Sequence, residues 1–359
     1  MAKVRIEGLT KRFGETVAVN HLTLEIGDGE FVSLLGPSGC GKTTTLRCIA
    51  GLERQDEGDI YIGDSLINDL SVPDRNTAMV FQFPVVYPGM TVRENLEFPL
   101  RQRGQSKSEV REKVEGTAKM LRIERSMEEM ASDLDVGGRQ RVALGRALVR
   151  SPEVLLLDEA LTNLDTRLKL MMIDEVKRLH EELRQTTVYV THDQSEAMMM
   201  ADRIAVMDKG FLKQYDSPEN LYRNPRNLFV AGFVGSPPMN FIQVTFDKER
   251  GCIAYGDFSV DVPELISVIG TKAAGPEILL GFRPEYVSVH KVCPSKKHVK
   301  GKVELAEFVG DYLFLDVQLD AIPIKVSAPG DLGVGAGDDV CIEFTKFHLF
   351  DKKTGEAIV

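Results

Sequence analysis

A phosphate-binding loop is the strongest chemical signal in the sequence. Residues 36–43, GPSGCGKT, fit the pattern GxxxxGK[ST], between a β-rich run and a helical pattern. Glycines let backbone amides approach phosphates closely, and a helix N-terminus adds partial positive charge. We expect Lys42 to contact the β- and γ-phosphates of ATP, and Thr43 to hold Mg²⁺ through its hydroxyl. The predicted nucleotide-binding residues are Gly36, Pro37, Ser38, Gly39, Cys40, Gly41, Lys42, Thr43 and Thr44.

A pair of acids provides the second signal. The run VLLLDE, residues 154–159, is a buried strand pattern that ends in two carboxylates. In a doubly wound sheet, ligands bind at the carboxyl ends of the strands. Asp158 is therefore expected to hold Mg²⁺ through water, and Glu159 to position or deprotonate an attacking water. The alternative is an acid pair that is only solvated.

The elements around these motifs indicate an α/β domain over residues 1–235. Short β-rich runs alternate with longer helical patterns there. We expect helices over 166–184 and 108–121, each with one apolar face. The strands expected to form the sheet are Phe31–Leu35, Thr77–Phe81, Val154–Leu157, Thr187–Val190 and Ile204–Met207.

A change of pattern follows residue 235. The segment VGSPPMNF, 234–241, contains glycine and two prolines and is a predicted hinge. After it the helical patterns stop, and short strands separated by turns predict a small all-β domain of the OB type over 236–359. Its expected strands are FIQVTFD, CIAYGDFSV, EILLGF, VELAEF, YLFLDVQL, IPIKVSA and VCIEFT.

Composition narrows the function classes. Lys and Arg total 44 against 54 Asp and Glu, a net charge of −10 that opposes nucleic acid as the main partner. No apolar run is long enough for a membrane helix, and the N-terminus lacks a secretion signal, so we expect a cytosolic chain. The five cysteines are scattered, which argues against a disulfide framework or a zinc site, and the six histidines show no cluster of metal ligands.

Longer motifs resemble one family, the ATPases of ABC transporters. They are RQRVALGRALVRSPEVLLLDEALTNLD at 139–165, VYVTHDQSEAMMMADRIAVMDKG at 188–210 and FQFPVVYPGMTVRENLEFPL at 81–100. The later segments SPPMNF and GFRPE are similar to those of sugar and glycerol-phosphate importers with an OB-type regulatory domain. The resemblance covers essentially the whole chain. It implies a P-loop NTPase domain followed by that all-β domain.

The resemblance also implies roles for further residues. Gln82 would reach the Mg²⁺ and the lytic water, and its loop would sense a membrane subunit. His192 would contact the γ-phosphate, and Asp165 would line a dimer interface. Phe13 stands where the family stacks adenine, although ordinary packing would also explain it. Residues of about 83–150 would form a helical subdomain with a groove for the permease.

One segment departs from the family pattern. The family places LSGGQ before RQRVA, and this segment of one subunit faces the phosphate loop of the other. Here the residues are Leu134, Asp135, Val136, Gly137 and Gly138. A carboxylate at 135 facing a phosphate about 4 Å away would be repelled by about 4 kcal/mol at an effective dielectric constant near 20. Asp is also a good helix N-cap, so the fold tolerates it. We expect slow hydrolysis by a homodimer, or pairing with a different ATPase subunit.

The resulting expectation is an ATP-hydrolysing subunit of a membrane importer. Its partners would be transmembrane permease subunits and, indirectly, an extracytoplasmic solute-binding protein. It would lie peripherally on the cytoplasmic side of the membrane, as a homodimer or heterodimer. A sugar or glycerol phosphate is the first-ranked cargo, ahead of polyamines. The alternatives are a regulatory protein that binds nucleotide without productive turnover, and a soluble ABC protein of translation or DNA repair.

Overall fold

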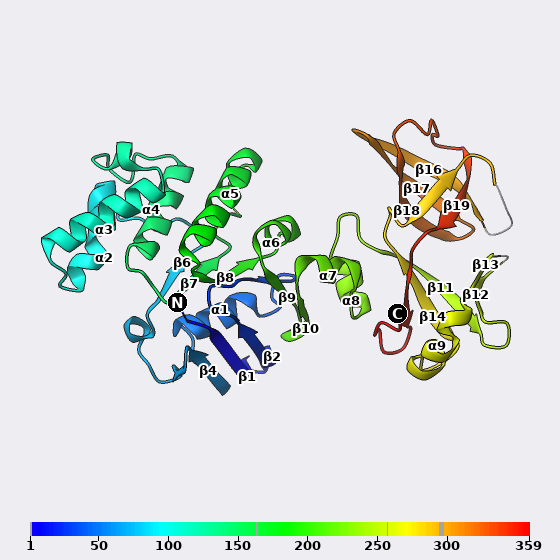
Figure 1. The fold of residues 1–359 in the computed structure, drawn as a ribbon, viewed down its shortest axis with the longest axis horizontal. Helices are drawn as coiled ribbons and strands as arrows, with labels where there is room; N and C mark the ends of the chain where they lie inside the picture. The colour runs from blue at the N-terminus through cyan, green and yellow to red at the C-terminus, as the bar shows by residue number, and fades with distance from the viewer. Residues whose placement is uncertain (1, 163, 257, 294–297) are drawn as a thin grey trace. The chain divides into compact units, whose positions relative to one another are not determined.

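The computed structural model describes residues 2–162, 164–256, 258–293 and 298–359. It divides into two compact units, Met1–Pro218 and Glu219–Val359 (Figure 1). The helices α7 (Pro218–Arg223) and α8 (Leu228–Phe233) precede the predicted hinge. The domain boundary expected at residue 235 stays a prediction.

A six-stranded sheet organises the first unit. Its order is β10-β9-β3-β8-β7-β6, and all neighbours are parallel except β9 and β10. The five strands predicted for this sheet are confirmed, each to within one residue at either end. The bounds are β3 (Phe31–Leu35), β6 (Thr77–Val80), β7 (Val154–Asp158), β8 (Thr186–Thr191), β9 (Arg203–Asp208) and β10 (Phe211–Asp216).

Both faces of this sheet are buried. Val154 and Leu156 of β7 pack in one core with α1 (Lys42–Ala50) and a second sheet, whereas Leu155 and Leu157 pack in another core with the longer helices. This alternation explains why β7 is apolar along its length. The second sheet is antiparallel, in the order β2-β1-β4-β5. Its strands are β1 (Val4–Phe13), β2 (Thr16–Ile26), β4 (Glu57–Ile62) and β5 (Ser65–Leu66).

Apart from α1, the helices described below for the first unit begin at residues whose side chains cap them. Thr91 and Ser106 each form a capping box with a glutamate three residues later. The helices are α2 (Val92–Gln102), α3 (Lys107–Met120), α4 (Val136–Leu148), α5 (Thr166–Leu183) and α6 (Gln194–Met200), and α3 and α5 confirm the two predicted helices. Figure 1 shows α2, α3 and α4 gathered at one end of the unit, within the range predicted for the helical subdomain.

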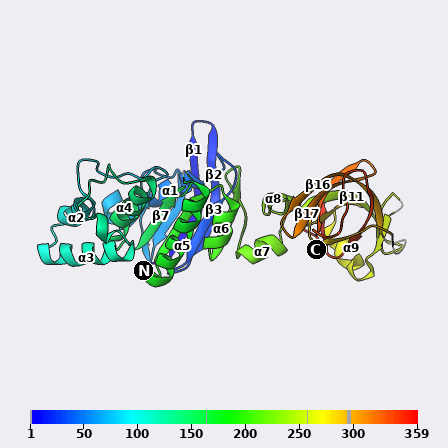
Figure 2. The same ribbon diagram turned by 90° about the horizontal axis from the view of Figure 1, so that it is seen from above.

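The second unit contains two five-stranded sheets around one core, in the orders β13-β12-β11-β14-β20 and β15-β19-β16-β17-β18. Figure 2 shows its strands curving around that core. The predicted strands are present, except that the single run CIAYGDFSV forms two strands, β12 and β13, which pair with each other in antiparallel fashion. Their bounds are β11 (Asn240–Asp247), β12 (Cys252–Tyr255), β13 (Phe258–Asp261), β14 (Glu277–Phe282), β16 (Val299–Val309), β17 (Tyr312–Leu319), β18 (Ile322–Pro329) and β19 (Asp339–Phe344).

One α-helix and two strands that follow the predicted hinge were not expected from the sequence. They are α9 (Ile266–Lys272), β15 (Val287–His290) and β20 (His348–Asp351). The expectation that helices end at the hinge is therefore wrong. The helix α9 is too short for a helical period to be recognised, and only Ile269 of its residues is buried. Among the helices of the described residues, none is both long and apolar enough to cross a bilayer.

A disulfide in the second unit also corrects the sequence analysis. Cys293 and Cys341 are bonded, with their Cα atoms 5.3 Å apart, although 48 residues separate them in the chain. The pairing arises because β19 lies beside β15, the strand that precedes Cys293. The wide spacing of the cysteines in the sequence was therefore a poor argument against a disulfide, because strand pairing brings distant residues together.

Candidate nucleotide site

The phosphate-binding loop connects β3 to α1 through glycines that the packing requires. A Cβ on Gly36 would lie 2.2 Å from the carbonyl oxygen of Met207, and one on Gly41 would lie 2.3 Å from that of Ala18. Gly41 also has a φ of 101°, which L side chains rarely adopt. The close approach of two backbones therefore explains these glycines, independently of any phosphate.

Lys42 is folded back over this loop. Its Nζ donates hydrogen bonds to the carbonyl oxygens of Gly36 at 2.7 Å and Pro37 at 2.8 Å. The side chain is buried, and its ammonium group is held at the start of α1, where the helix N-terminus already favours anions. The arrangement presents positive charge to an anion in the loop.

Thr43 and Asp158 meet across the edge of the sheet. The Thr43 hydroxyl donates a hydrogen bond of 3.1 Å to Oδ1 of Asp158 at the end of β7. Burial raises the pKa of Asp158 above its usual range, although the hydrogen bond from Thr43 acts to lower it. These two oxygen donors fit a hard divalent cation such as Mg²⁺.

Glu159 and His192 face each other beside this pair. Glu159 has a φ of 48°, and its N–H donates to the carbonyl oxygen of Val190 at 3.0 Å. Oε1 of Glu159 lies 3.4 Å from Nδ1 of His192. The side chain of His192 is about half exposed, so both groups can reach a ligand. The structure thus brings together four predicted residues from the ends of neighbouring strands and one helix.

The turn that carries His192 rests on buried charges that the sequence analysis missed. Glu196 on α6 is fully buried and forms an ion pair of 3.0 Å with Lys169 of α5. Lys169 also pairs with Asp193 at 3.1 Å, and Thr191 donates a hydrogen bond of 2.6 Å to Glu196. Thr191 and Asp193 flank His192, so the network fixes the loop on both sides. The spacing H-D-x-x-E was visible in the sequence, but the partner lysine was not.

Three other predicted residues occupy separate elements. Gln82 is half-buried and follows β6, whose Val80 pairs with Leu157, so Gln82 lies toward the edge that carries Asp158. Phe13 ends β1 and is about half exposed, with Nζ of Lys11 at 5.1 Å from its ring centre. Asp165 caps α5 by accepting hydrogen bonds from the backbone of Arg167 and Leu168.

The divergent segment 134–138 forms a well-capped helix start. Asp135 is the N-cap of α4, and its Oδ1 accepts a hydrogen bond of 2.6 Å from the N–H of Gly138. A Cβ on Gly137 would lie 2.9 Å from Cδ1 of Leu168, so a larger residue there would require the Leu168 side chain to shift. Val136 is exposed. The expected N-cap role of Asp135 is confirmed.

Together, the sheet order, the glycine loop and the clustered Thr43, Asp158 and Glu159 define a P-loop nucleotide-hydrolysing protein. Comparisons with known proteins narrow this class. Residues 19–162 match the ABC transporter family, 235–287 a MalK OB fold domain, and 280–350 a TOBE domain.

Full-length relatives agree with these matches. The chain is 44% identical to the trehalose/maltose import ATP-binding protein MalK of Thermococcus litoralis, with all of both chains covered. It is 40% identical to the sn-glycerol-3-phosphate import ATP-binding protein UgpC of Ruegeria pomeroyi, over 100% of this chain and 99% of that one.

A solved dimeric ATP-binding cassette in a post-hydrolysis state, bound to ADP and Pi, aligns with a TM-score of 0.53 and 33% identity. The alignment covers 60% of this chain and 98% of that one. The chain belongs to the ABC transporter family, as an ATP-binding and ATP-hydrolysing subunit with C-terminal OB-type domains. The comparisons do not favour the alternative of a regulator without turnover.

Proposed function

We propose that the chain powers a membrane importer for a sugar or glycerol phosphate. It binds permease subunits on the cytoplasmic side of the membrane, and an extracytoplasmic binding protein delivers the solute to that permease. The proposal is supported by identity along the whole chain to import subunits for trehalose/maltose and sn-glycerol-3-phosphate. A soluble ABC protein of translation or DNA repair is a weaker candidate because its relatives would not be import subunits.

The residues of the nucleotide site have distinct roles in the binding of ATP and Mg²⁺. Lys42 binds the β- and γ-phosphates, and Phe13 stacks on adenine. Thr43 and Asp158, with Gln82, hold Mg²⁺, which neutralises phosphate charge when bound. The 3.1 Å contact between Thr43 and Asp158 supports this assignment, because it already gathers oxygen donors beside the loop.

Glu159 and His192 act on the water and on the terminal phosphate. Glu159 accepts a hydrogen bond from the attacking water and orients it, and His192 donates a hydrogen bond to the γ-phosphate. Their separation of 3.4 Å lets them act on neighbouring atoms of one reacting centre. The turn anchored by Glu196 holds His192 there.

Two subunits complete the catalytic unit in this proposal. Residues 135–138 of one subunit face the phosphate loop of the other, and Asp165 lies at their interface. The subunits form a homodimer, or a heterodimer with a second ATPase. Asp135 places a carboxylate toward the nucleotide, so a homodimer is expected to hydrolyse ATP slowly.

The meeting of Thr43, Asp158, Glu159 and His192 carries the proposal, and two measurements test it. Mg²⁺-dependent ATP turnover should fall by about 100- to 1,000-fold in Glu159→Gln, whereas the exposed Glu153→Gln should leave it unchanged. Purification from membranes should recover permease subunits with the chain. Equal turnover in Glu159→Gln would refute the catalytic assignment, and recovery without any membrane protein would refute the transporter role.

A further inference from the structure

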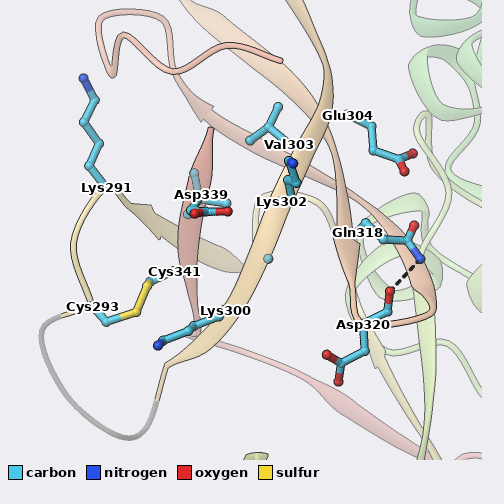
Figure 3. Close-up of a pocket in the computed structure, with 12 residues that line it drawn as sticks. Lys291, Cys293, Lys300, Lys302, Val303, Glu304, Gln318, Asp320, Asp339 and Cys341 are labelled. Carbon is cyan, nitrogen blue, oxygen red and sulfur yellow. Dashed lines mark hydrogen bonds between the residues drawn. A yellow bond between two sulfur atoms is a disulfide. The ribbon is translucent and has the colours of Figure 1, made fainter. Parts of the chain in front are cut away.

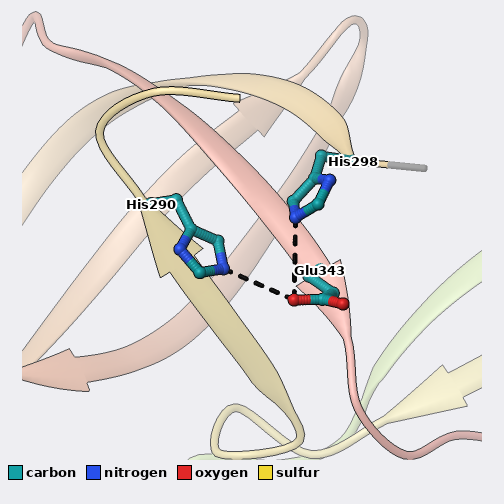
Figure 4. Close-up of side chains that lie close together, drawn as sticks. All are labelled: His290, His298 and Glu343. Atoms are coloured by element: carbon teal, nitrogen blue, oxygen red, sulfur yellow. Dashed lines mark ion pairs between the residues drawn. The ribbon is translucent and has the colours of Figure 1, made fainter. Parts of the chain in front are cut away.

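Two histidines and a glutamate converge on one face of the second unit. His290 ends β15, His298 directly precedes β16, and Glu343 lies on β19 between these two strands. The register places His290 opposite Cys341 and Val299 opposite Ile342, which brings both histidines beside Glu343. Figure 4 shows the two rings directed at the same carboxylate. We refer to these three residues as the histidine–glutamate cluster.

The distances in this cluster suit metal coordination better than hydrogen bonding. Oε2 of Glu343 lies 3.4 Å from Nε2 of His290 and 3.6 Å from Nε2 of His298, and one potential ligand atom of each residue lies within 4.8 Å of the others. Hydrogen bonds of this type are shorter, at about 2.7–3.2 Å. Tetrahedral Zn²⁺ bonds separate nitrogen and oxygen ligands by about 3.3–3.5 Å.

Burial of the nitrogen atoms supports a ligand at this point. The side chain of His298 is only 6% exposed, and that of His290 is 35% exposed. Nε2 of His290 is itself shielded from solvent and has no hydrogen-bond partner among the residues that the structure describes. The rings pack edge to face, with centroids 5.3 Å apart, so their directions are already set.

The disulfide restrains the same region. Cys293 lies between the two histidines in sequence, and its partner Cys341 is two residues before Glu343 on β19. Figure 3 shows this bond joining the segment after β15 to β19. A ligand set anchored on three paired strands and one cross-link loses less conformational entropy when it binds a metal.

We propose that His290, His298 and Glu343 form a Zn²⁺ site. Imidazole nitrogens with one carboxylate suit Zn²⁺, whereas Mg²⁺ and Ca²⁺ prefer sites made of oxygen atoms. Three protein ligands leave the fourth position for water, as the half-exposed Glu343 allows. The site is independent of the nucleotide site, and its test does not depend on transport.

A cavity of about 940 Å³ borders the disulfide (Figure 3), but it supports no ligand assignment of its own. Its lining mixes lysines with acids. Examples are Lys291, Lys300, Glu304 and Asp339. A lining of mixed charge favours neither an anionic nor a cationic ligand. The histidine–glutamate cluster, in contrast, indicates a class of ligand, a metal cation.

Calorimetric titration of the untagged, full-length, oxidised protein with ZnCl₂ tests the site. We expect one Zn²⁺ per chain, and a weakening of at least about tenfold in His298→Gln and in Glu343→Gln, because losing even an outer-shell partner typically costs about 10- to 100-fold. Glu304→Gln, an exposed carboxylate of the same unit, is the matched control and should bind as the parent does. MgCl₂ should give no binding at this position. Absence of Zn²⁺ binding, or equal binding by all three variants, would overturn the proposal.

Cobalt substitution identifies the ligands directly, even if a variant folds poorly. The Co²⁺ form of the parent protein should show visible d–d bands without a thiolate-to-cobalt charge-transfer band in the near ultraviolet. The described free cysteines, Cys40, Cys48 and Cys252, are all buried, and Cys293 and Cys341 are bonded to each other. A thiolate band would assign the metal to cysteine and refute the histidine–glutamate site.

Discussion

The two units gather charged side chains in different ways. In the first unit, Lys42 and Thr43 come from one continuous motif, and Asp158 and Glu159 end one strand. In the second unit, each member of the histidine–glutamate cluster comes from a different part of the sheet. A parallel sheet brings strand ends to one edge as a rule, whereas an antiparallel pairing depends on its register. Charge clusters of the first kind can therefore be predicted from sequence, and those of the second kind cannot.

The largest effect on stability is expected from the ion pair of Lys169 and Glu196, which joins two helices of the first unit. Lys169→Met would leave the fully buried Glu196 without its cation, and we expect unfolding to become easier by about 3–5 kcal/mol. Chemical denaturation with and without the change measures this difference. Arg167→Met, at an exposed position of the same helix, is the control. A loss below about 1 kcal/mol would show that Glu196 is not held as a buried charge.

Lys42→Ala tests whether the phosphate loop depends on its cation. We expect ATP turnover to fall by about 100- to 1,000-fold, since the change removes the charge that is proposed to face the phosphates. Affinity for ATP should fall as well, as measured by equilibrium titration. The exposed Lys119→Ala should change neither quantity. Unchanged affinity and turnover in Lys42→Ala would contradict the nucleotide site itself.

Restoring the family pattern in the divergent segment should raise activity. Asp135→Ser with Val136→Gly retains an N-cap and removes a carboxylate and a side chain from the proposed interface. We expect the ATP turnover of the homodimer to rise by at least about tenfold. A tenfold rise requires the barrier to fall by about 1.4 kcal/mol, which is less than the roughly 4 kcal/mol of repulsion expected from the carboxylate. Asp133→Ser should have no effect. Turnover that is already fast, and unchanged by the restoration, would refute the interface role.

We expect the ionised carboxylate of Asp158 to lower the stability of the fold although turnover requires it. Burial raises the pKa of the Asp158 carboxyl in the folded chain, so the unfolded chain loses this proton at a lower pH. The free energy of unfolding therefore falls as the pH rises through the pKa of the folded chain. Asp158→Asn should therefore raise the thermal midpoint of the nucleotide-free protein at neutral pH. This gain should disappear in acid below the ordinary pKa of aspartate, while turnover is lost at every pH. A lower midpoint at neutral pH would show that the carboxylate stabilises the fold.

Glu343→Gln should have the smallest effect on the metal-free protein. Glu343 is half exposed, so its ion pairs with the histidines contribute less than about 1 kcal/mol to folding. Thermal unfolding without metal should thus be nearly unchanged, and added Zn²⁺ should raise the midpoint of the parent more than that of the variant. A large loss without metal would mean that the cluster is a structural ion pair.

The sequence alone determined the parts of this protein that are local in the chain. The phosphate loop, the acid pair after β7 and the strands of the central sheet depend on short runs whose periodicity and glycines are visible without a fold. The short helix α9 and the strands β15 and β20 were missed because a few residues give too weak a period.

Only the tertiary structure decided the contacts between distant segments. Lys169 meets Glu196 because α5 packs against α6, and Cys293 meets Cys341 because β15 pairs with β19. The pairings of β15 and of β16 with β19 join His290 and His298 to Glu343. Register and helix packing arise from the whole core, which no single stretch of the sequence encodes, so these clusters become visible only once the chain has folded.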